Sequence, residues 1–266
     1  MELLKFVRRR SFLSEVVYTV LNVALAVAVV LVIRYTESIW LGILIVMVSK
    51  WRILAVRPRY WLANFLSNLI DIIVSVSFVL HLYTINAAPI EEGRQLVLLG
   101  VGTLLYILWL LILKPRSKRS YMVAQAGVAV LLGTAALFTV SFAWPVSLVV
   151  IGMWVLGYSA ARHVLGAYDD ETHGLFLSVL WGLVFAEIGW VAYHWTIAYS
   201  LPLITSVLLP QVAIIVTLVS FVAYKSYDSF HHHQKIRTSD IILPLLFTLS
   251  VIAVLLFVFN RVGTSI

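Results

Sequence analysis

Two carboxylic acids lie deep inside long apolar stretches of the chain, where ionisable residues are rare. Asp71 is the eleventh residue of the stretch Trp61–Tyr83, and Glu187 is the fourteenth residue of Gly174–Ala198. At ~1.5 Å per residue in a helix, each lies roughly 15–20 Å from one end of its segment. A charged side chain at the centre of a bilayer costs about 2.5–3.5 kcal/mol and often marks a proton or ion pathway. Asp71 and Glu187 are therefore our first candidates for protonation sites in transport.

Polar residues accompany Asp71 along one face of the expected helix. The spacing i, i+4, i+7 and i+11 is occupied by Asn64, Asn68, Asp71 and Ser75, which places them on a single side. Such a stripe can line an aqueous path, and Asn68 is then a second candidate for the same site. It can also join helices by hydrogen bonds worth about 0.6–2 kcal/mol each. The sequence leaves both interpretations open.

Two further polar residues belong to the same hypothesis. His194 follows Glu187 by seven residues, so both fall on one helix face. Gln211 directly follows Pro210 inside the apolar stretch Pro202–Tyr224. Because proline cannot donate a backbone hydrogen bond, we expect a kink at Pro210 that leaves a carbonyl group free.

A short loop carries the other group of candidates. Carboxylates and imidazoles close together can hold a divalent cation or the metal of a phosphate-bearing lipid. Acids before a helix can also simply offset the positive end of its dipole, and we favour this interpretation. We expect no dedicated metal site and no cofactor, and the absence of cysteine excludes thiolate ligands. The candidates in this loop are Arg162, His163, Asp169, Asp170, Glu171 and His173.

The elements that position these residues are predicted to be membrane-spanning helices. Apolar residues make up 62% of the chain and charged residues 12%, whereas soluble domains have about 45–50% and about 25%. Runs this long cross a bilayer as helices, because every backbone polar group must be satisfied within the segment. The nine predicted segments are Val16–Ile33, Ile39–Val56, Trp61–Tyr83, Gln95–Leu113, Tyr121–Trp144, Val146–Ala161, Gly174–Ala198, Pro202–Tyr224 and Ile241–Asn260.

The positive charges indicate how these segments are oriented. Of the 19 Lys and Arg residues, all but Arg34, Arg94 and Arg261 fall in alternate loops, which the positive-inside rule assigns to the cytoplasm. Segment Ile39–Val56 is weakly apolar at its end, but two crossings are needed to keep the basic N-terminus and the next basic loop on one side. Lys50 and Arg52, near the end of this segment, can extend their charged groups to the membrane interface. The N-terminus is then cytoplasmic and the C-terminus lies outside.

The sequence therefore predicts an all-α, polytopic transmembrane helix bundle of about nine spans, a single integral membrane domain over residues 1–266 with no soluble domain. We expect a plasma-membrane location, contact with anionic lipid headgroups at the cytoplasmic loops, and no binding of nucleic acid. Three functions fit. A structural or accessory membrane protein comes first, because each polar feature has an adequate packing explanation. A small-solute or proton-linked transporter using Asp71 and Glu187 is the alternative, and a lipid-modifying enzyme with a cytoplasmic-face site is the third.

Overall fold

The computed structural model describes residues 2–141, 143–168, 171–195, 197–201 and 204–259. These residues are helical for the most part, and the strands among them form one two-stranded hairpin. The predicted helical architecture is confirmed, with the hairpin as a small departure. The chain divides into two compact units, Met1–Ser117 and Lys118–Ile266, each with its own interior.

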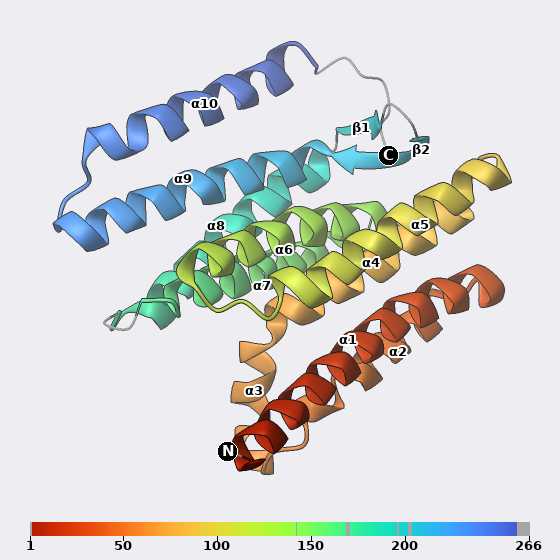
Figure 1. Ribbon diagram of the computed structural model, residues 1–266. Coiled ribbons are helices and arrows are strands. Elements are labelled where there is room, and N and C mark those ends of the chain that lie inside the picture. Colours follow the sequence, from red (N-terminus) through yellow and green to blue (C-terminus); the bar gives the residue numbers. More distant parts are fainter. Residues whose placement is uncertain (1, 142, 169–170, 196, 202–203, 260–266) are drawn as a thin grey trace. The chain divides into compact units, whose positions relative to one another are not determined.

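The described part of the first unit contains five α-helices. They are α1 (Glu2–Thr36), α2 (Ile39–Ser49), α3 (Trp61–Ser67), α4 (Leu69–Ala87) and α5 (Glu92–Leu108). The turns η1 (Trp51–Ile53) and η2 (Pro58–Tyr60) connect α2 to α3, and α5 continues into the π-helical turn η3 (Trp109–Leu113). In Figure 1, α3 runs at an angle to the long axis of α4. The core joins α1, α2, α4 and α5 through Val29, Ile33, Val46, Val79, Leu82 and Leu99.

The stretch Trp61–Tyr83, predicted as one helix, is broken at Asn68. Helices α3 and α4 meet there, and Asn68 has φ −102° and ψ 3°. Its side-chain amide donates to the backbone oxygen of Asn64 at 2.7 Å, and local bonds of this kind compete with regular helix formation. The prediction of a continuous helix is therefore wrong, and Asp71 lies in the first turn of α4.

Helix α2 is shorter than the predicted segment Ile39–Val56. Its 11 residues extend ~16 Å, about half of the ~30 Å hydrocarbon thickness of a bilayer. The helix ends at Ser49, and the side chain of Lys50 turns into the unit, where it is 6% exposed. The ammonium group of Lys50 is therefore buried within the unit beside Asp71 and does not extend away from the protein, as the sequence suggests it could.

The second unit consists of helices with one hairpin between α8 and α9. In Figure 1, α10 runs alongside α9, the two being drawn in blue. Helix α6 packs against α7 and α9, and α7 packs extensively against α8. The described elements are α6 (Arg119–Val140), α7 (Val146–Leu165), α8 (Gly174–His194), β1 (Ala198–Leu201), β2 (Ile204–Pro210), α9 (Gln211–His233) and α10 (Thr238–Phe257).

The helix predicted over Pro202–Tyr224 begins and ends later than expected. Residues 202 and 203 lie outside the described part of the chain, and β2 occupies the segment up to Pro210. Helix α9 starts at Gln211, so Pro210 precedes the helix and does not kink it. The predicted kink is therefore wrong. A residue without an N–H group fits at a helix start, where no intrahelical bond is lost, better than in the interior.

Glycines allow α7 and α8 to approach closely. A Cβ atom at Gly157 would lie 2.6 Å from Cγ of Phe185, and one at Gly189 would lie 2.5 Å from Cγ of Met153. Neither position has room for a methyl group unless its neighbour shifts. Small residues at such contacts are the usual means by which membrane helices pack against one another.

Eight helices in the described chain are long and apolar enough to cross a membrane. Their outer faces carry large apolar side chains; α10, for example, exposes Leu243, Phe247 and Phe257. Soluble monomers rarely expose such extensive apolar surface, whereas a lipid-facing surface requires it. The candidate spans are Phe12–Thr36, Leu69–Ala87, Glu92–Leu113, Arg119–Val140, Val146–Leu165, Gly174–His194, Gln211–His233 and Thr238–Phe257.

Candidate functional site

A buried charge cluster in the first unit is built around Asp71. Its Oδ2 atom accepts from Nζ of Lys50 and from Nζ of Lys114, the latter at 2.9 Å. Its Oδ1 atom lies 3.3 Å from Nε1 of Trp109 and 3.4 Å from Oγ of Ser75. The side chains of Lys50 and Asp71 are 6% and 12% exposed. A carboxylate this buried requires opposite charge and hydrogen bonds, and the cluster supplies both.

The turn η3 brings two of these partners to the same carboxylate. The backbone N–H of Lys114 donates to the carbonyl oxygen of Trp109 at 2.9 Å, a bond that spans five residues. In an α-helix, positions five apart point about 140° away from each other. The wider π turn, a feature common at functional sites, places both side chains on one side.

The geometry of the cluster favours an ionised Asp71 that holds helices together. Two ammonium groups and two neutral donors contact its carboxylate, and a group with this many donors is stabilised in its charged form. Asn68 bonds instead to Asn64 and to Oγ of Ser67. The predicted polar stripe therefore serves two local networks, one at the α3–α4 break and one at the charge cluster.

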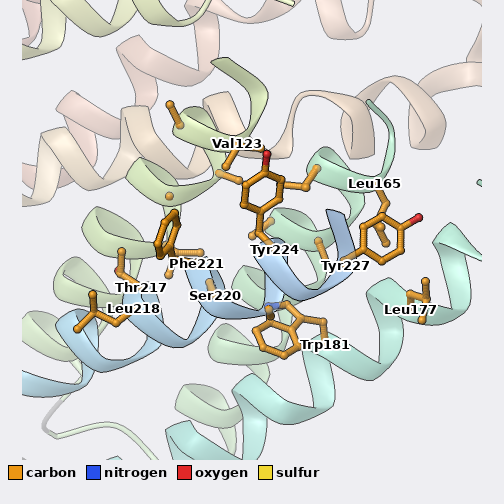
Figure 2. Close-up of a pocket in the computed structure, with 18 of the residues that line it drawn as sticks. Val123, Leu165, Leu177, Trp181, Thr217, Leu218, Ser220, Phe221, Tyr224 and Tyr227 are labelled. Atoms are coloured by element: carbon orange, nitrogen blue, oxygen red, sulfur yellow. The ribbon is translucent and has the colours of Figure 1, made fainter. Parts of the chain in front are cut away.

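A cavity of about 590 Å³ lies within the second unit between α6, α7, α8 and α9. This volume falls in the range of about 300–1,000 Å³ that is typical of ligand pockets. Figure 2 shows that the side chains around it are mainly apolar and aromatic. Ser120, Ala124 and Phe221 line it and are exposed, so the cavity opens at the surface of the unit. Its wall includes Val123, Val130, Leu177, Trp181, Leu218 and Phe221.

A polar cluster stands at the end of this cavity where α6 begins. Oδ1 of Asp228 accepts from the hydroxyl of Tyr168 at 2.8 Å and lies 3.6 Å from Nη1 of Arg119. The guanidinium carbon of Arg119 lies 4.1 Å from the centroid of the Tyr168 ring. Burial and the hydrogen bond to Asp228 raise the pKa of the Tyr168 phenol, which therefore stays protonated at neutral pH.

Tyr227 connects the cavity with the loop before α8. The residue lines the cavity, and its hydroxyl donates to Oε2 of Glu171. Oε1 of Glu171 accepts from the backbone N–H of His173 at 2.6 Å. The hydrogen bond from Tyr227 is the main reason that the pKa of Glu171 lies below its usual value, so this carboxyl is ionised at neutral pH. The contact with His173, just before α8, is compatible with the capping role expected for the loop acids.

The second predicted midplane acid, Glu187, lies in a different unit from Asp71. It is exposed on α8, and its side chain makes no hydrogen bond or ion pair with any described residue. His194 is also exposed, as expected for the same face, and its ring packs against Trp190 with centroids 5.1 Å apart. The role of both residues as protonation sites stays a prediction.

Gln211 lies at the start of α9 and is 5% exposed. Its side-chain amide donates to the hydroxyl of Tyr199 at 2.7 Å and to the backbone oxygen of Leu255 at 3.0 Å. These bonds tie the hairpin and α10 to α9. Both bonds are donated by the amide nitrogen and have a structural role.

Among the loop candidates that the structure describes, Glu171 bonds to His173, whereas His163 has its partner outside the loop. His163 hydrogen-bonds to Oε1 of Gln125 at 2.7 Å, within the helical part of the unit. Arg162 lies beside Gly174 in the first turn of α8. Asp169 and Asp170 lie outside the described residues. Among the residues that the structure does describe, no group of three His, Cys, Asp or Glu side chains is placed to hold a metal ion.

Sequence reasoning missed the residues that organise both sites. Lys114 and Trp109 give no local signal, because their partner Asp71 is distant in sequence and is reached only through the fold. Arg119 and Tyr168 meet Asp228 in the same way. The one weak signal for this cluster is Asp228, a charged residue that lies four positions after Tyr224 on the same helix.

The fold and both sites define a class of protein: a multi-pass helical membrane protein with a buried charge cluster and an apolar cavity. Comparison of the chain with models of protein families, with curated proteins and with solved structures gives no match. The chemistry of the two sites is therefore the basis for a function.

Proposed function

We propose that this protein is an accessory membrane protein, without turnover, whose second unit binds one chain of a lipid-like amphiphile. The observation that supports this proposal is the cavity of about 590 Å³, apolar along its length and bordered at one end by ionised and hydrogen-bonding groups. An amphiphile has the same division into apolar and polar parts. The openings beside Ser120, Ala124 and Phe221 offer a lateral path by which an acyl chain can enter the cavity.

The length of the cavity matches one leaflet of a bilayer. Its lining runs from Ser120 to Val130 on α6 and from Thr217 to Tyr227 on α9. Each stretch covers ten residue steps, or ~15 Å along a helix. This is half of the ~30 Å hydrocarbon core, which is the depth that one acyl chain occupies. By the predicted orientation, the leaflet is the cytoplasmic one.

The transport hypothesis has less support from the described geometry. Asp71 is engaged by two lysines, and the exposed Glu187 has no polar partner among the described residues. The enzyme hypothesis relied on a cluster of loop acids and histidines, but His163 bonds to Gln125 and Glu171 accepts hydrogen bonds from Tyr227 and from the backbone of His173. Both functions stay predictions, and we prefer a binding protein.

We also propose that both units form one plasma-membrane domain with nine crossings, the N-terminus facing the cytoplasm. Since the chain has no cysteine, single replacements report topology cleanly. Thr36→Cys and Gly93→Cys should react with a membrane-impermeant thiol reagent from outside, and Ser117→Cys from the cytoplasmic side. If positions 36 and 93 are both labelled from outside, the chain crosses the membrane twice between them. One of these crossings must then be α2 and the other α4. Labelling of positions 36 and 93 from opposite sides would rule out nine spans.

The binding proposal is tested by filling the cavity. Gly127 lines it, and a Cβ atom at Gly127 meets nothing within 4 Å. We expect Gly127→Phe to weaken binding of dioleoyl phosphatidylcholine to the purified full chain at least tenfold, measured by native mass spectrometry from a mild detergent. Gly100→Phe is the matched control, because Gly100 also has open space around its Cβ position and does not line the cavity. Equal lipid binding by both folded variants would refute the cavity as the site.

A further inference from the structure

The polar end of the cavity has a basic character that can select the ligand's headgroup. Arg119 directly precedes Ser120, which lines the cavity at its opening. Lys225 lies next to another lining residue, Tyr224, with its ammonium nitrogen 5.7 Å from that ring's centroid. Among the described residues, the acids near this end are Asp228 and Glu171, and Glu171 accepts hydrogen bonds from Tyr227 and His173.

Arg119 is held in place while part of its guanidinium group stays available. Its stacking on Tyr168 and its contacts with Asp228 and His232 fix the group, and both polar contacts use Nη1. Nε and Nη2 make no hydrogen bond to any described residue, and the side chain is 38% exposed. A guanidinium offers a planar set of donors that matches the oxygens of phosphate or carboxylate groups.

The distribution of neighbouring charge favours an anion at this position. Asp228 is 3.6 Å from Nη1 of Arg119, a long ion pair that neutralises the arginine incompletely. Lys118 and Lys225 add positive charge close in sequence to the lining residues Ser120 and Tyr224. Basic groups beside a membrane surface attract anionic lipids, whereas a zwitterionic headgroup gains less from them.

We propose that the amphiphile bound in this cavity is an anionic lipid, with its phosphate group bound by Arg119 and one acyl chain lying between α6 and α9. This inference rests on the proposed function and specifies its ligand. The acyl chain contacts the apolar wall of the cavity, and the charge of the headgroup determines which lipids bind most tightly.

The test compares dioleoyl phosphatidylglycerol with dioleoyl phosphatidylcholine, which share their chains and differ in headgroup charge. We expect the full chain to bind the phosphatidylglycerol at least fivefold more tightly. Arg119→Gln should weaken binding of phosphatidylglycerol more than binding of phosphatidylcholine and so remove this preference, and Arg119→Lys should retain part of it. Arg237→Gln is the control, because Arg237 is exposed in the same unit and does not line the cavity.

Each outcome separates the headgroup inference from the cavity proposal. Equal binding of both lipids by the wild-type chain, with binding still lost in Gly127→Phe, would overturn the anionic headgroup and leave the cavity in place. Lipid binding that is insensitive to Gly127→Phe would refute the proposed function itself. Displacement of phosphatidylglycerol by an equal concentration of inorganic phosphate would show a simple anion site and would also overturn the inference.

Discussion

Asp71→Ala is expected to destabilise the first unit by about 3–5 kcal/mol, the loss typical of removing one partner from a buried ion pair. The replacement would leave the ammonium group of Lys50, whose side chain is 6% exposed, without its counterion. Lys114 is 33% exposed and can recover solvation more easily. The free energy of unfolding of the full chain in lipid nanodiscs measures this effect.

Glu92→Ala provides the matched control for this prediction. Glu92 also pairs with a basic residue, Arg34, at 2.8 Å, but its side chain is 76% exposed. Exposed pairs contribute about 0–1 kcal/mol. The double variant Lys50→Met, Asp71→Leu should recover much of the stability, because apolar residues can replace a buried pair. Similar small losses for Asp71→Ala and Glu92→Ala would contradict a structural role for the charge cluster.

Tyr168→Ala is expected to destabilise the second unit by about 3–5 kcal/mol, as for other large aromatic residues removed from an interior. Tyr168 is 3% exposed. Its ring lies 5.0 Å from that of Tyr227 and 4.6 Å from that of His231. The replacement removes these contacts and the stacking surface for Arg119. Unfolding of the second unit, followed by a fluorescent label on that unit, reports the change.

Two companion variants separate the contributions of the Tyr168 side chain. Tyr168→Phe keeps the ring and removes the hydrogen bond to Asp228, for an expected loss of about 1–3 kcal/mol. Phe230→Ala removes an aromatic side chain that is 48% exposed near the end of α9, the helix that also carries Tyr227 and His231. We expect it to change the free energy of unfolding by no more than about 0.5 kcal/mol. If Tyr168→Ala lowered the stability as little as Phe230→Ala, the cluster of Tyr168, Asp228 and Arg119 would not stabilise the segment that follows α7.

The helices could be predicted because their signal is local. A run of apolar residues long enough to cross a bilayer is visible in any window of the sequence, and eight such helices occur in the structure. The break at Asn68 and the helix start at Gln211 were missed, since both depend on a competition between local hydrogen bonds and helix continuation. Hydropathy reports only the mean polarity of such a region.

The two sites could be predicted only in part. Asp71 stands out because its charge is conspicuous in an apolar segment, yet its partners Lys50 and Lys114 lie 21 and 43 positions away. The sequence neighbours of Lys50 give no sign that its ammonium group pairs with a buried carboxylate. The cavity left no local signal either: Val123, Trp181 and Phe221 look like ordinary apolar residues until helices distant in sequence surround one space.

The most direct test of the proposed function is an electron cryomicroscopy map of the full chain in nanodiscs that contain phosphatidylglycerol. We predict an elongated density between Val123, Trp181 and Phe221, with a stronger feature beside the guanidinium group of Arg119. The Gly127→Phe variant should lose this density while its helices remain in place. A map in which lipids are resolved around the protein but the cavity is empty, or closed by its own side chains, would contradict the account.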